Sequence, residues 1–175
     1  MRRAVFLDRD GVINRAIVRD GKPFPPDSLA EVEILPGVHE AVQKLHVANY
    51  LLIVVTNQPD VARGTAKRED VEQINAFLAS QLLIDDFKTC YHDVDDMCYC
   101  RKPLPGAILE AAQEYNIDLF KSFMVGDRWR DVEAGAAAGC KTVYINYHYA
   151  EKKPNAPDFI VSSLFEAKKI ILGEF

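Results

Sequence analysis

Asp8 and Asp10 are separated by one residue and follow the short apolar run of residues 4–7. A short apolar run that ends in a glycine-containing turn is typical of a buried strand that stops abruptly. The first carboxylate then lies at the carboxyl end of that strand, where ligands bind in open α/β sheets. Of two carboxylates so placed, one can attack as a nucleophile while the other donates and accepts protons. A strand followed by a chemically silent aspartate-rich turn fits the same short pattern, so the rest of the chain must decide.

Polar side chains recur at the ends of apolar runs further along the chain, in a combination that suits a phosphate-and-magnesium site. A hydroxyl can donate to a phosphate oxygen, an ammonium can neutralise it, and carboxylates supply the oxygen ligands that Mg²⁺ prefers. Each group taken alone also fits a helix cap or a turn. Their succession at strand ends argues against that structural interpretation. The groups are, in chain order, Thr56 and Asn57, then Lys102, then Asp127, with Asp131 four residues later.

A second cluster of reactive side chains comprises Cys90, His92, Cys98 and Cys100, which fall within eleven residues. Three thiolates and one imidazole are the ligand set of a closed tetrahedral structural zinc site. Disulfides are disfavoured in a cytosolic chain, and redox-active cysteines more often show Cys-x-x-Cys spacing. We therefore expect a zinc-binding loop at about residues 90–100 that holds Zn²⁺ with no open position for catalysis.

Alternating strand and helix patterns must supply the scaffold for these groups. Such alternation predicts an α/β fold with a central parallel sheet and helices on both faces, a three-layer Rossmann-like sandwich. No gap is long enough for a separate cap domain, and the proline-rich stretch 14–27 is expected to form a flap or hairpin over the site. The expected strands lie at residues 4–7, 51–55, 87–91, 123–125, 141–146 and 159–161, and the expected helices open at 36–37, carry residues 71–78, open at 105–106, and span 131–138 and 163–172.

Composition is typical of a small enzyme. With 175 residues and 49% hydrophobic content, we expect a single domain over residues 1–175 with one continuous core. The 21 basic and 26 acidic residues give a net charge of −5, which argues against nucleic acid as a partner, because such surfaces are usually basic. No run approaches the roughly 18 apolar residues of a membrane span, and the apolar run after Met1 is too short for a secretory signal. We therefore expect a cytoplasmic monomer that binds a small molecule.

Residues 5–145 strongly resemble the haloacid dehalogenase superfamily of phosphohydrolases, whose four motifs match the strand-end groups named above. The resemblance implies that Asp8 forms an aspartyl-phosphate and that Asp10 is the general acid/base. It also implies that Mg²⁺ is held by the Asp8 carboxylate, the Asp10 backbone carbonyl and Asp127. Asp131 would orient the motif-three lysine or a metal-bound water. The chemistry agrees, because a cation is needed to reduce repulsion between a carboxylate and a dianionic phosphate.

The zinc loop narrows the resemblance to a subgroup, the heptose bisphosphate phosphatases and the histidinol-phosphate phosphatases. In both groups the zinc ligands end immediately before the motif-three lysine, so a metal there would position Arg101 and Lys102. The segment Ala62-Arg63-Gly64 is similar to the heptose group. Pro59-Asp60 and the short spacing between the zinc ligands depart from that group, and Arg128 stands where a lysine often follows the motif-four aspartate. The phosphate- and substrate-binding residues expected from these comparisons are Thr56, Asn57, Arg63, Arg101, Lys102 and Arg128.

We therefore expect a magnesium-dependent sugar-phosphate phosphatase that releases the 7-phosphate of D-glycero-D-manno-heptose 1,7-bisphosphate. Histidinol-phosphate phosphatase is the near alternative. A catalytically silent binding module on the same fold is a third, against which both motif-one aspartates argue, and the acidic balance disfavours a polynucleotide phosphatase. Arg63 and Arg101 are candidates for binding the second phosphate of a bisphosphate, although a solvated loop arginine and a brace for the zinc loop are equally compatible with their positions.

Overall fold

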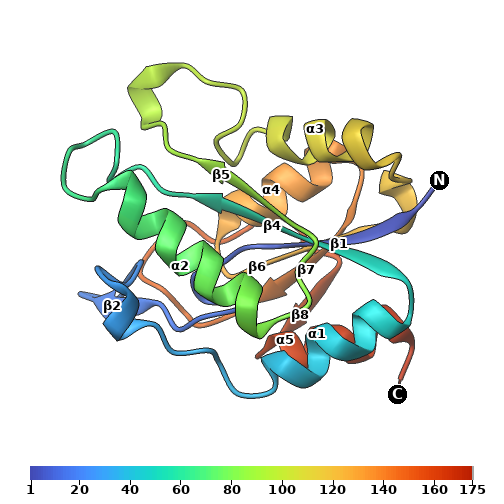
Figure 1. Ribbon diagram of the computed structural model, residues 1–175. Helices are drawn as coiled ribbons and strands as arrows, with labels where there is room; N and C mark the ends of the chain where they lie inside the picture. The colour runs from blue at the N-terminus through green and yellow to red at the C-terminus, as the bar shows by residue number, and fades with distance from the viewer. Residues whose placement is uncertain (175) are drawn as a thin grey trace.

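A six-stranded sheet forms the centre of the computed structural model, which describes residues 1–174 (Figure 1). All neighbouring strands of this sheet run parallel. The chain moves outward from the first strand in one direction and then in the other, which places a topological switch point beside that strand. The spatial order is β5 (Asp86–Cys90), β4 (Tyr50–Asn57), β1 (Arg3–Leu7), β6 (Phe123–Gly126), β7 (Lys141–Ile145) and β8 (Phe159–Val161).

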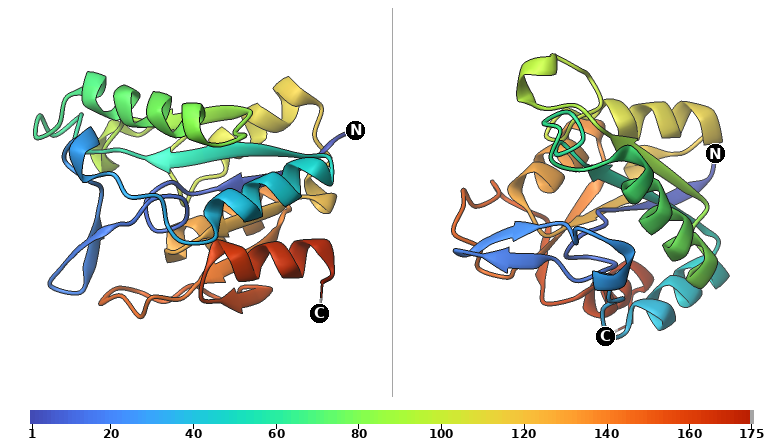
Figure 2. Two further views of the ribbon diagram at one scale, coloured as in Figure 1. Left: turned by 60° about the horizontal axis from the view of Figure 1, so that its bottom comes forward. Right: turned by 60° about the vertical axis from the view of Figure 1, so that its left-hand side comes forward.

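Helices cover both faces of the sheet and give the three layers expected from the sequence (Figures 1 and 2). Side chains of β1 alternate between the faces, because successive residues of a strand point to opposite sides. Val5 and Leu7 pack in the core under α1 (Val38–Val47), α2 (Arg68–Gln81) and α5 (Leu164–Leu172). Ala4 and Phe6 pack in a second core under α3 (Gly106–Tyr115) and α4 (Trp129–Ala138). Within residues 1–174, none of these helices is long and apolar enough to cross a membrane.

The proline-rich stretch forms the expected hairpin, from β2 (Ile17–Arg19) and β3 (Lys22–Phe24). Asp20 and Gly21 connect the strands with φ values of 51° and 73°, as a tight primed turn requires. The tip is anchored, since Ala150 N donates to Gly21 O at 2.8 Å. We call the segment 17–24 the flap. Three short 3₁₀ helices (Leu29–Glu31, Val94–Asp96 and Leu119–Lys121) complete the described elements, and no cap domain interrupts the described segments between β1 and β6.

Among the element boundaries that differ from the sequence-based expectation, two bear on the site. β4 extends through Thr56 and Asn57, so these two polar residues lie within the strand and pair with the end of β5. α4 begins at Trp129, two residues earlier than expected. The reason is a capping interaction, because the Asp131 carboxylate accepts a hydrogen bond from Arg128 N at 2.9 Å. A carboxylate at this position of the first turn satisfies an otherwise unpaired backbone donor.

The loops that leave the carboxyl ends of the strands gather at one end of the molecule. Figure 1 shows the flap and the loops that follow β4 and β5 on the left, with both chain termini on the right, and the left-hand view of Figure 2 agrees. The flap and these two loops border the switch point beside β1, where an open parallel sheet binds its ligands.

Candidate active site

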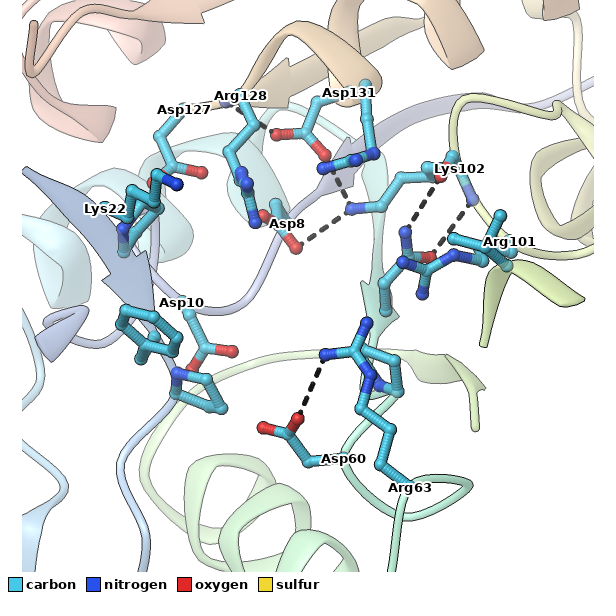
Figure 3. A pocket seen from close by; sticks show the side chains of 17 residues that line it. Asp8, Asp10, Lys22, Asp60, Arg63, Arg101, Lys102, Asp127, Arg128 and Asp131 are labelled. Carbon is cyan, nitrogen blue, oxygen red and sulfur yellow. Dashed lines mark hydrogen bonds and ion pairs between the residues drawn. The ribbon is translucent and has the colours of Figure 1, made fainter. Parts of the chain in front are cut away.

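The carboxyl ends of β1, β4 and β6 converge on a cavity of about 430 Å³ (Figure 3). Asp8 directly follows β1, Asn57 ends β4, and Asp127 directly follows β6. Because β1 lies between the other two strands, the three positions are neighbours at one edge of the sheet. Lys22 of the flap lies across the cavity from Lys102. Four of the sequence-predicted groups, Asp8, Asn57, Lys102 and Asp127, are therefore brought together from four separate parts of the chain.

Lys102 is the central cation of the cavity and is almost fully buried. Its Nζ lies 2.9 Å from Asp8 Oδ1 and 2.7 Å from Asp131 Oδ1, and it donates to Val55 O at 2.6 Å. Burial alone would lower the pKa of Lys102, but the charges of Asp131 and Asp8 raise it above its ordinary value. Asn57 fixes the lysine backbone through two reciprocal hydrogen bonds, both 3.0 Å long. Lys102 is thus held permanently charged against the Asp8 carboxylate.

Asp8 is buried with one oxygen occupied, since Oδ1 accepts from Arg9 N at 2.9 Å in addition to Lys102. Burial raises the pKa of Asp8 to about 6, and the negative charge of Asp131 adds to that shift while Lys102 opposes it. A nearby cation favours the charged form of a carboxylate, so a bound metal ion would lower this pKa. At neutral pH the geometry therefore leaves an ionised carboxylate with its second oxygen available for attack on phosphorus.

Asp10 is held by a ring of donors, with its side chain 16% exposed and lining the cavity. Its carboxylate accepts from the Arg9 guanidinium at 3.2 Å, from Asn14 Nδ2 at 2.9 Å and from Gln58 Nε2 at 2.9 Å. Gln58 also donates to Thr56 Oγ1 at 3.0 Å, which ties the first two motifs together. Thr56 itself is buried and is not among the residues that line the cavity. The expected phosphate contact of Thr56 stays a prediction.

Asp127 offers the clearest sign that the site suits a metal ion. It is fully buried, and its Oδ1 has no hydrogen-bond partner within residues 1–174, while its Oδ2 accepts from Tyr149 Oη at 2.8 Å. Burial raises the pKa of Asp127 well above its usual range, and the charges of Asp8 and Asp131 add to this. A side chain at Gly11 would collide with the carboxylate, because a Cβ there would lie 2.0 Å from Asp127 Oδ2. Unpartnered buried carboxylate oxygen in a negative site fits a hard cation such as Mg²⁺.

The three acidic side chains of the cavity are close enough to share an ion, since one oxygen each of Asp8, Asp127 and Asp131 lie within 4.8 Å of one another. Asp131 differs from the other two because both of its oxygens already have protein partners. Oδ1 pairs with Lys102 and Oδ2 accepts from Arg128 N. This arrangement suits the expected role of Asp131 in orienting Lys102, and leaves Asp8 and Asp127 as the carboxylates open to the metal.

The second metal-type cluster lies on the loop between β5 and α3. Cys90 is the last residue of β5, and one donor atom each of Cys90, His92, Cys98 and Cys100 lie within 4.8 Å of one another. Cys90 Sγ lies 3.7 Å from Cys98 Sγ, and Cys100 Sγ lies 3.3 Å from His92 Nδ1. Four donors at such spacing, three of them sulfur, fit a tetrahedral zinc ion with metal–sulfur distances of about 2.3 Å.

Arg63 and Arg101 both line the cavity, and both are also attached to the zinc-type loop. Arg63 donates to the two oxygens of Asp93, from Nε at 2.6 Å and from Nη2 at 2.8 Å, and forms a weaker pair with Asp60. The hydrogen bonds from Arg63 lower the pKa of Asp93 to about 2. Arg101 donates to His92 O at 3.1 Å. Both arginines therefore brace the zinc-type loop in the structure, which is one of the roles that their sequence positions allow.

Several residues of the site were not singled out by sequence reasoning. The flap contributes Lys22 to the lining of the cavity. Tyr149 and Glu151 lie on the loop after β7, where Glu151 accepts two hydrogen bonds from Arg128 Nε at 3.1 and 3.2 Å. No local pattern marks the tyrosine or the glutamate, because their roles depend on the path of a long loop. Arg130, in the first turn of α4, also lines the cavity; its sequence position beside the motif-four aspartates is compatible with substrate cover and with a solvated helix start.

Comparisons with known proteins show the family to which the chain belongs. The family model of the haloacid dehalogenase-like hydrolases matches residues 26–139. A D-glycero-beta-D-manno-heptose-1,7-bisphosphate 7-phosphatase of Rhodopseudomonas palustris is 37% identical, over 79% of this chain and 80% of the relative. The enzyme of the same name from Pasteurella multocida is 32% identical over 99% of this chain and 98% of the relative.

Among solved structures, the chain is similar to the D,D-heptose 1,7-bisphosphate phosphatase of B. bronchiseptica, crystallised with magnesium and phosphate. The TM-score is 0.80 at 30% identity, with 99% of each chain covered. The fold, the site and these matches define a hydrolase. The chain belongs to the haloacid dehalogenase-like hydrolase family. The expected resemblance to the heptose bisphosphate phosphatases is confirmed. The expectation of a phosphatase is confirmed as well, because the family consists of hydrolases and the relatives are named as phosphatases.

Proposed function

We propose that this hydrolase is a magnesium-dependent phosphatase that removes the 7-phosphate of D-glycero-β-D-manno-heptose 1,7-bisphosphate. The observation that carries the proposal is the arrangement of Asp8 and Asp10 in one cavity, with Lys102 bonded to the first, in a chain related over nearly its full length to enzymes of that name. The β anomer is adopted from the names of those relatives.

In the first step, the free carboxylate oxygen of Asp8 attacks the phosphorus of the ester. A bond forms between this oxygen and phosphorus while the bond between phosphorus and the sugar oxygen breaks. Asp10 donates its proton to the departing sugar oxygen, which leaves as a hydroxyl. Lys102, bonded to the other oxygen of Asp8, keeps the nucleophile oriented and offsets negative charge near the phosphoryl group.

In the second step, Asp10 acts as a base and takes a proton from a water molecule. The water oxygen attacks the phosphorus of the aspartyl-phosphate, and the bond between phosphorus and Asp8 breaks. Inorganic phosphate leaves, Asp8 is regenerated as a carboxylate, and Asp10 carries the proton needed for the next cycle. The hydrogen bonds from Arg9, Asn14 and Gln58 keep Asp10 pointed at the cavity in both steps.

The two metal sites would have different roles, one electrostatic and one structural. Mg²⁺ bound by Asp8, Asp127 and the Asp10 carbonyl would offset the charge that otherwise keeps an anionic carboxylate from an anionic phosphate. Zn²⁺ bound by the four ligands of the loop would fix the segment that leads directly from Cys100 through Arg101 to Lys102. The zinc site thus has a mechanical role, because Lys102 lies two residues from a zinc ligand.

Phosphate release from a panel of substrates tests the proposal. We expect the highest kcat/KM for the β anomer of heptose 1,7-bisphosphate, with the α anomer, heptose 7-phosphate and histidinol phosphate as competitors. The product should be heptose 1-phosphate, identified by phosphorus NMR. A higher kcat/KM for histidinol phosphate would overturn the substrate assignment while leaving the aspartyl-phosphate chemistry in place.

We further propose that the enzyme works in the cytoplasm as a monomeric single domain without nucleic-acid partners. The net charge of −5 argues against a nucleic-acid partner, and a cluster of free thiols suited to a metal ion supports a reducing compartment. Size-exclusion chromatography with light scattering tests the oligomeric state, and a mass of twice the 19.7 kDa chain would contradict it.

A further inference from the structure

Arg9 stands between the two catalytic aspartates in the sequence and is one of the largest fully buried side chains. A buried charge costs free energy unless its donors are hydrogen-bonded. Two nitrogens of the guanidinium face the Asp10 carboxylate, which accepts from Nη2 at 3.2 Å and from Nε at 3.3 Å. The third nitrogen, Nη1, donates to Asn75 Oδ1 at 3.0 Å. Asp10 and Asn75 therefore hold different nitrogens of one rigid plane.

Asn75 is a polar residue on the buried face of a helix. The buried positions of α2 follow the spacing of a single apolar face, yet one of them is an amide. These positions are Val71, Ile74, Asn75 and Leu78. A buried amide destabilises a fold unless it is hydrogen-bonded. Asn75 meets this condition, because its Oδ1 accepts from the arginine and its Nδ2 donates to Thr89 Oγ1 at 3.1 Å. An apolar side chain would pack there without such partners, so packing alone does not explain the asparagine.

Thr89, Asn75 and Arg9 together form a hydrogen-bonded chain that we call the Arg9 relay. It begins in β5, where Thr89 directly precedes Cys90 of the thiol cluster, crosses α2, and ends at the Asp10 carboxylate after β1. No member of the relay lines the active-site cavity, whereas Asp10 does. The relay can therefore contribute to the reaction only by orienting Asp10, since its members do not reach the substrate.

We propose that Asn75, acting through Arg9, is a positioning residue that sets the orientation of the Asp10 carboxylate for proton transfer. The inference rests on the proposed function in one respect, namely that Asp10 is the general acid/base. Because a guanidinium is planar, a hydrogen bond that fixes Nη1 also fixes the edge that meets Asp10. Proton transfer needs heavy atoms within about 2.6–3.2 Å, and a displacement of about 1 Å can cost roughly 10²-fold in rate. Loss of Asn75 should therefore slow proton transfer without removing a contact to the substrate.

Kinetics of Asn75→Leu, an apolar replacement of similar size, test the relay with two substrates. For heptose 1,7-bisphosphate we expect kcat and kcat/KM to fall roughly tenfold with little change in KM. For p-nitrophenyl phosphate kcat/KM should change much less, because nitrophenolate departs without taking a proton. A rise in KM with unchanged kcat, or an equal loss of kcat/KM for both substrates, would overturn the inference.

A double-mutant cycle with Asp10→Asn separates positioning from a general structural effect. Once Asp10 cannot transfer a proton, the further change Asn75→Leu should lower kcat by less than about twofold, because the group that it positions no longer acts. A merely structural role would lower kcat by the same factor in both backgrounds, and that result would overturn the relay.

Two further variants grade the effect and check its specificity. Thr89→Val removes the acceptor of the Asn75 amide while keeping the contact between Asn75 and Arg9, so kcat should fall by a smaller factor than in Asn75→Leu. Gln73→Leu changes an exposed residue of the same helix, and its kinetics should match the wild type. Melting temperatures of all variants check that the fold is retained. If Asn75→Leu does not fold, the same cycle with Thr89→Val decides the question.

The outcomes also distinguish failure of the relay from failure of the proposed function. Near-wild-type turnover by Asp10→Asn would refute the acid/base assignment, and the relay with it. A slow Asp10→Asn beside an Asn75→Leu that behaves as the wild type would overturn the relay alone. If heptose bisphosphate is not hydrolysed, another sugar phosphate that the enzyme hydrolyses takes its place. A loss confined to that alkyl ester would support the relay with a different sugar.

Discussion

The two metal-type clusters of this protein are built on opposite plans. The carboxylates of Asp8 and Asp127 follow adjacent central strands and are buried, and one oxygen of Asp127 has no hydrogen-bond partner among residues 1–174. The cluster that begins at Cys90 lies on a loop, is partly exposed, and has its four donor atoms turned toward one another. The first cluster is incomplete without a ligand, as catalysis requires, whereas the second is a closed set with no position for substrate. Incompleteness, more than burial or ligand count, separates the candidate reactive site from the candidate structural one.

The two clusters are also connected, because Lys102 follows the last zinc-type ligand by two residues and donates to Asp8. Damage to the carboxylate cluster should therefore remove chemistry with little effect on folding. Damage to the thiol cluster should loosen the fold first and reduce the chemistry second. Variants in each cluster test this separation.

Replacement of the nucleophile should have the largest effect. Asp8→Asn keeps nearly the same shape but cannot attack phosphorus, so kcat should fall by roughly 10⁴-fold or more. Asp10→Asn should be slowed by roughly 10²- to 10⁴-fold, as for loss of a general acid/base. Steady-state phosphate release measures both variants, and circular dichroism checks the fold. Near-wild-type turnover by Asp8→Asn would refute the mechanism.

Loss of a thiol ligand should show the opposite order of effects. Cys100→Ser should reduce the zinc content below one equivalent and lower the free energy of unfolding by several kcal/mol, because metal binding contributes directly to folding. Turnover should fall as Lys102 loses its anchor. Elemental analysis and chemical denaturation measure the two effects, with Cys140→Ala, a buried cysteine outside the cluster, as the control. Zinc-free wild-type protein prepared without chelators would contradict the assignment.

The hydroxyl of Tyr149 offers a finer test of the carboxylate cluster. It donates to Asp127 Oδ2, so Tyr149→Phe should leave that carboxylate less well oriented and weaken Mg²⁺ binding about tenfold. Calorimetric titration with Mg²⁺ measures the affinity without reference to turnover. Tyr147→Phe is the matched control, since that hydroxyl donates to the Gly11 carbonyl instead of to a carboxylate. An equal loss of affinity in both variants would mean that the loop as a whole, and not this hydrogen bond, sets the affinity.

The pKa of Asp8 gives the smallest predicted effect, a pH dependence of metal stabilisation. An acid whose folded-state pKa is raised above its unfolded value destabilises the fold as pH rises between the two values, here from about 4 to about 6. Asp127 shifts in the same direction. Bound Mg²⁺ offsets the free-energy cost of burying these two carboxylates in their ionised form. It should therefore raise the melting temperature more at about pH 7.5, where they are ionised, than at about pH 5. An equal increase at both pH values would count against the buried acidic cluster as the Mg²⁺ site.

The sequence was sufficient for the fold class and for the groups at the strand ends, because both follow from local patterns. An apolar run followed by Asp8, or by Asp127, predicts a strand end without any knowledge of its neighbours. The pairing of Arg63 with Asp93 could not be predicted, since it depends on where the loop after β5 turns. Tyr149 was missed for the same reason, because a long loop brings it back to Asp127. Contacts made by residues on long loops can be identified only when the three-dimensional path of the loop is known.

The anchored tip of the flap constrains how related sequences can vary. Gly21 adopts a left-handed backbone and lies so close to the neighbouring loop that a Cβ would approach that of Ala150 to 2.9 Å. Only a residue without a side chain meets both conditions while residue 150 carries a Cβ. The two positions, about 130 residues apart in the chain, should therefore vary together among relatives that keep this contact. Where position 150 carries a larger side chain, the turn of the flap should be displaced or remodelled. The residue types at these two positions, which take no part in the chemistry, should therefore indicate whether a relative keeps this conformation of the flap.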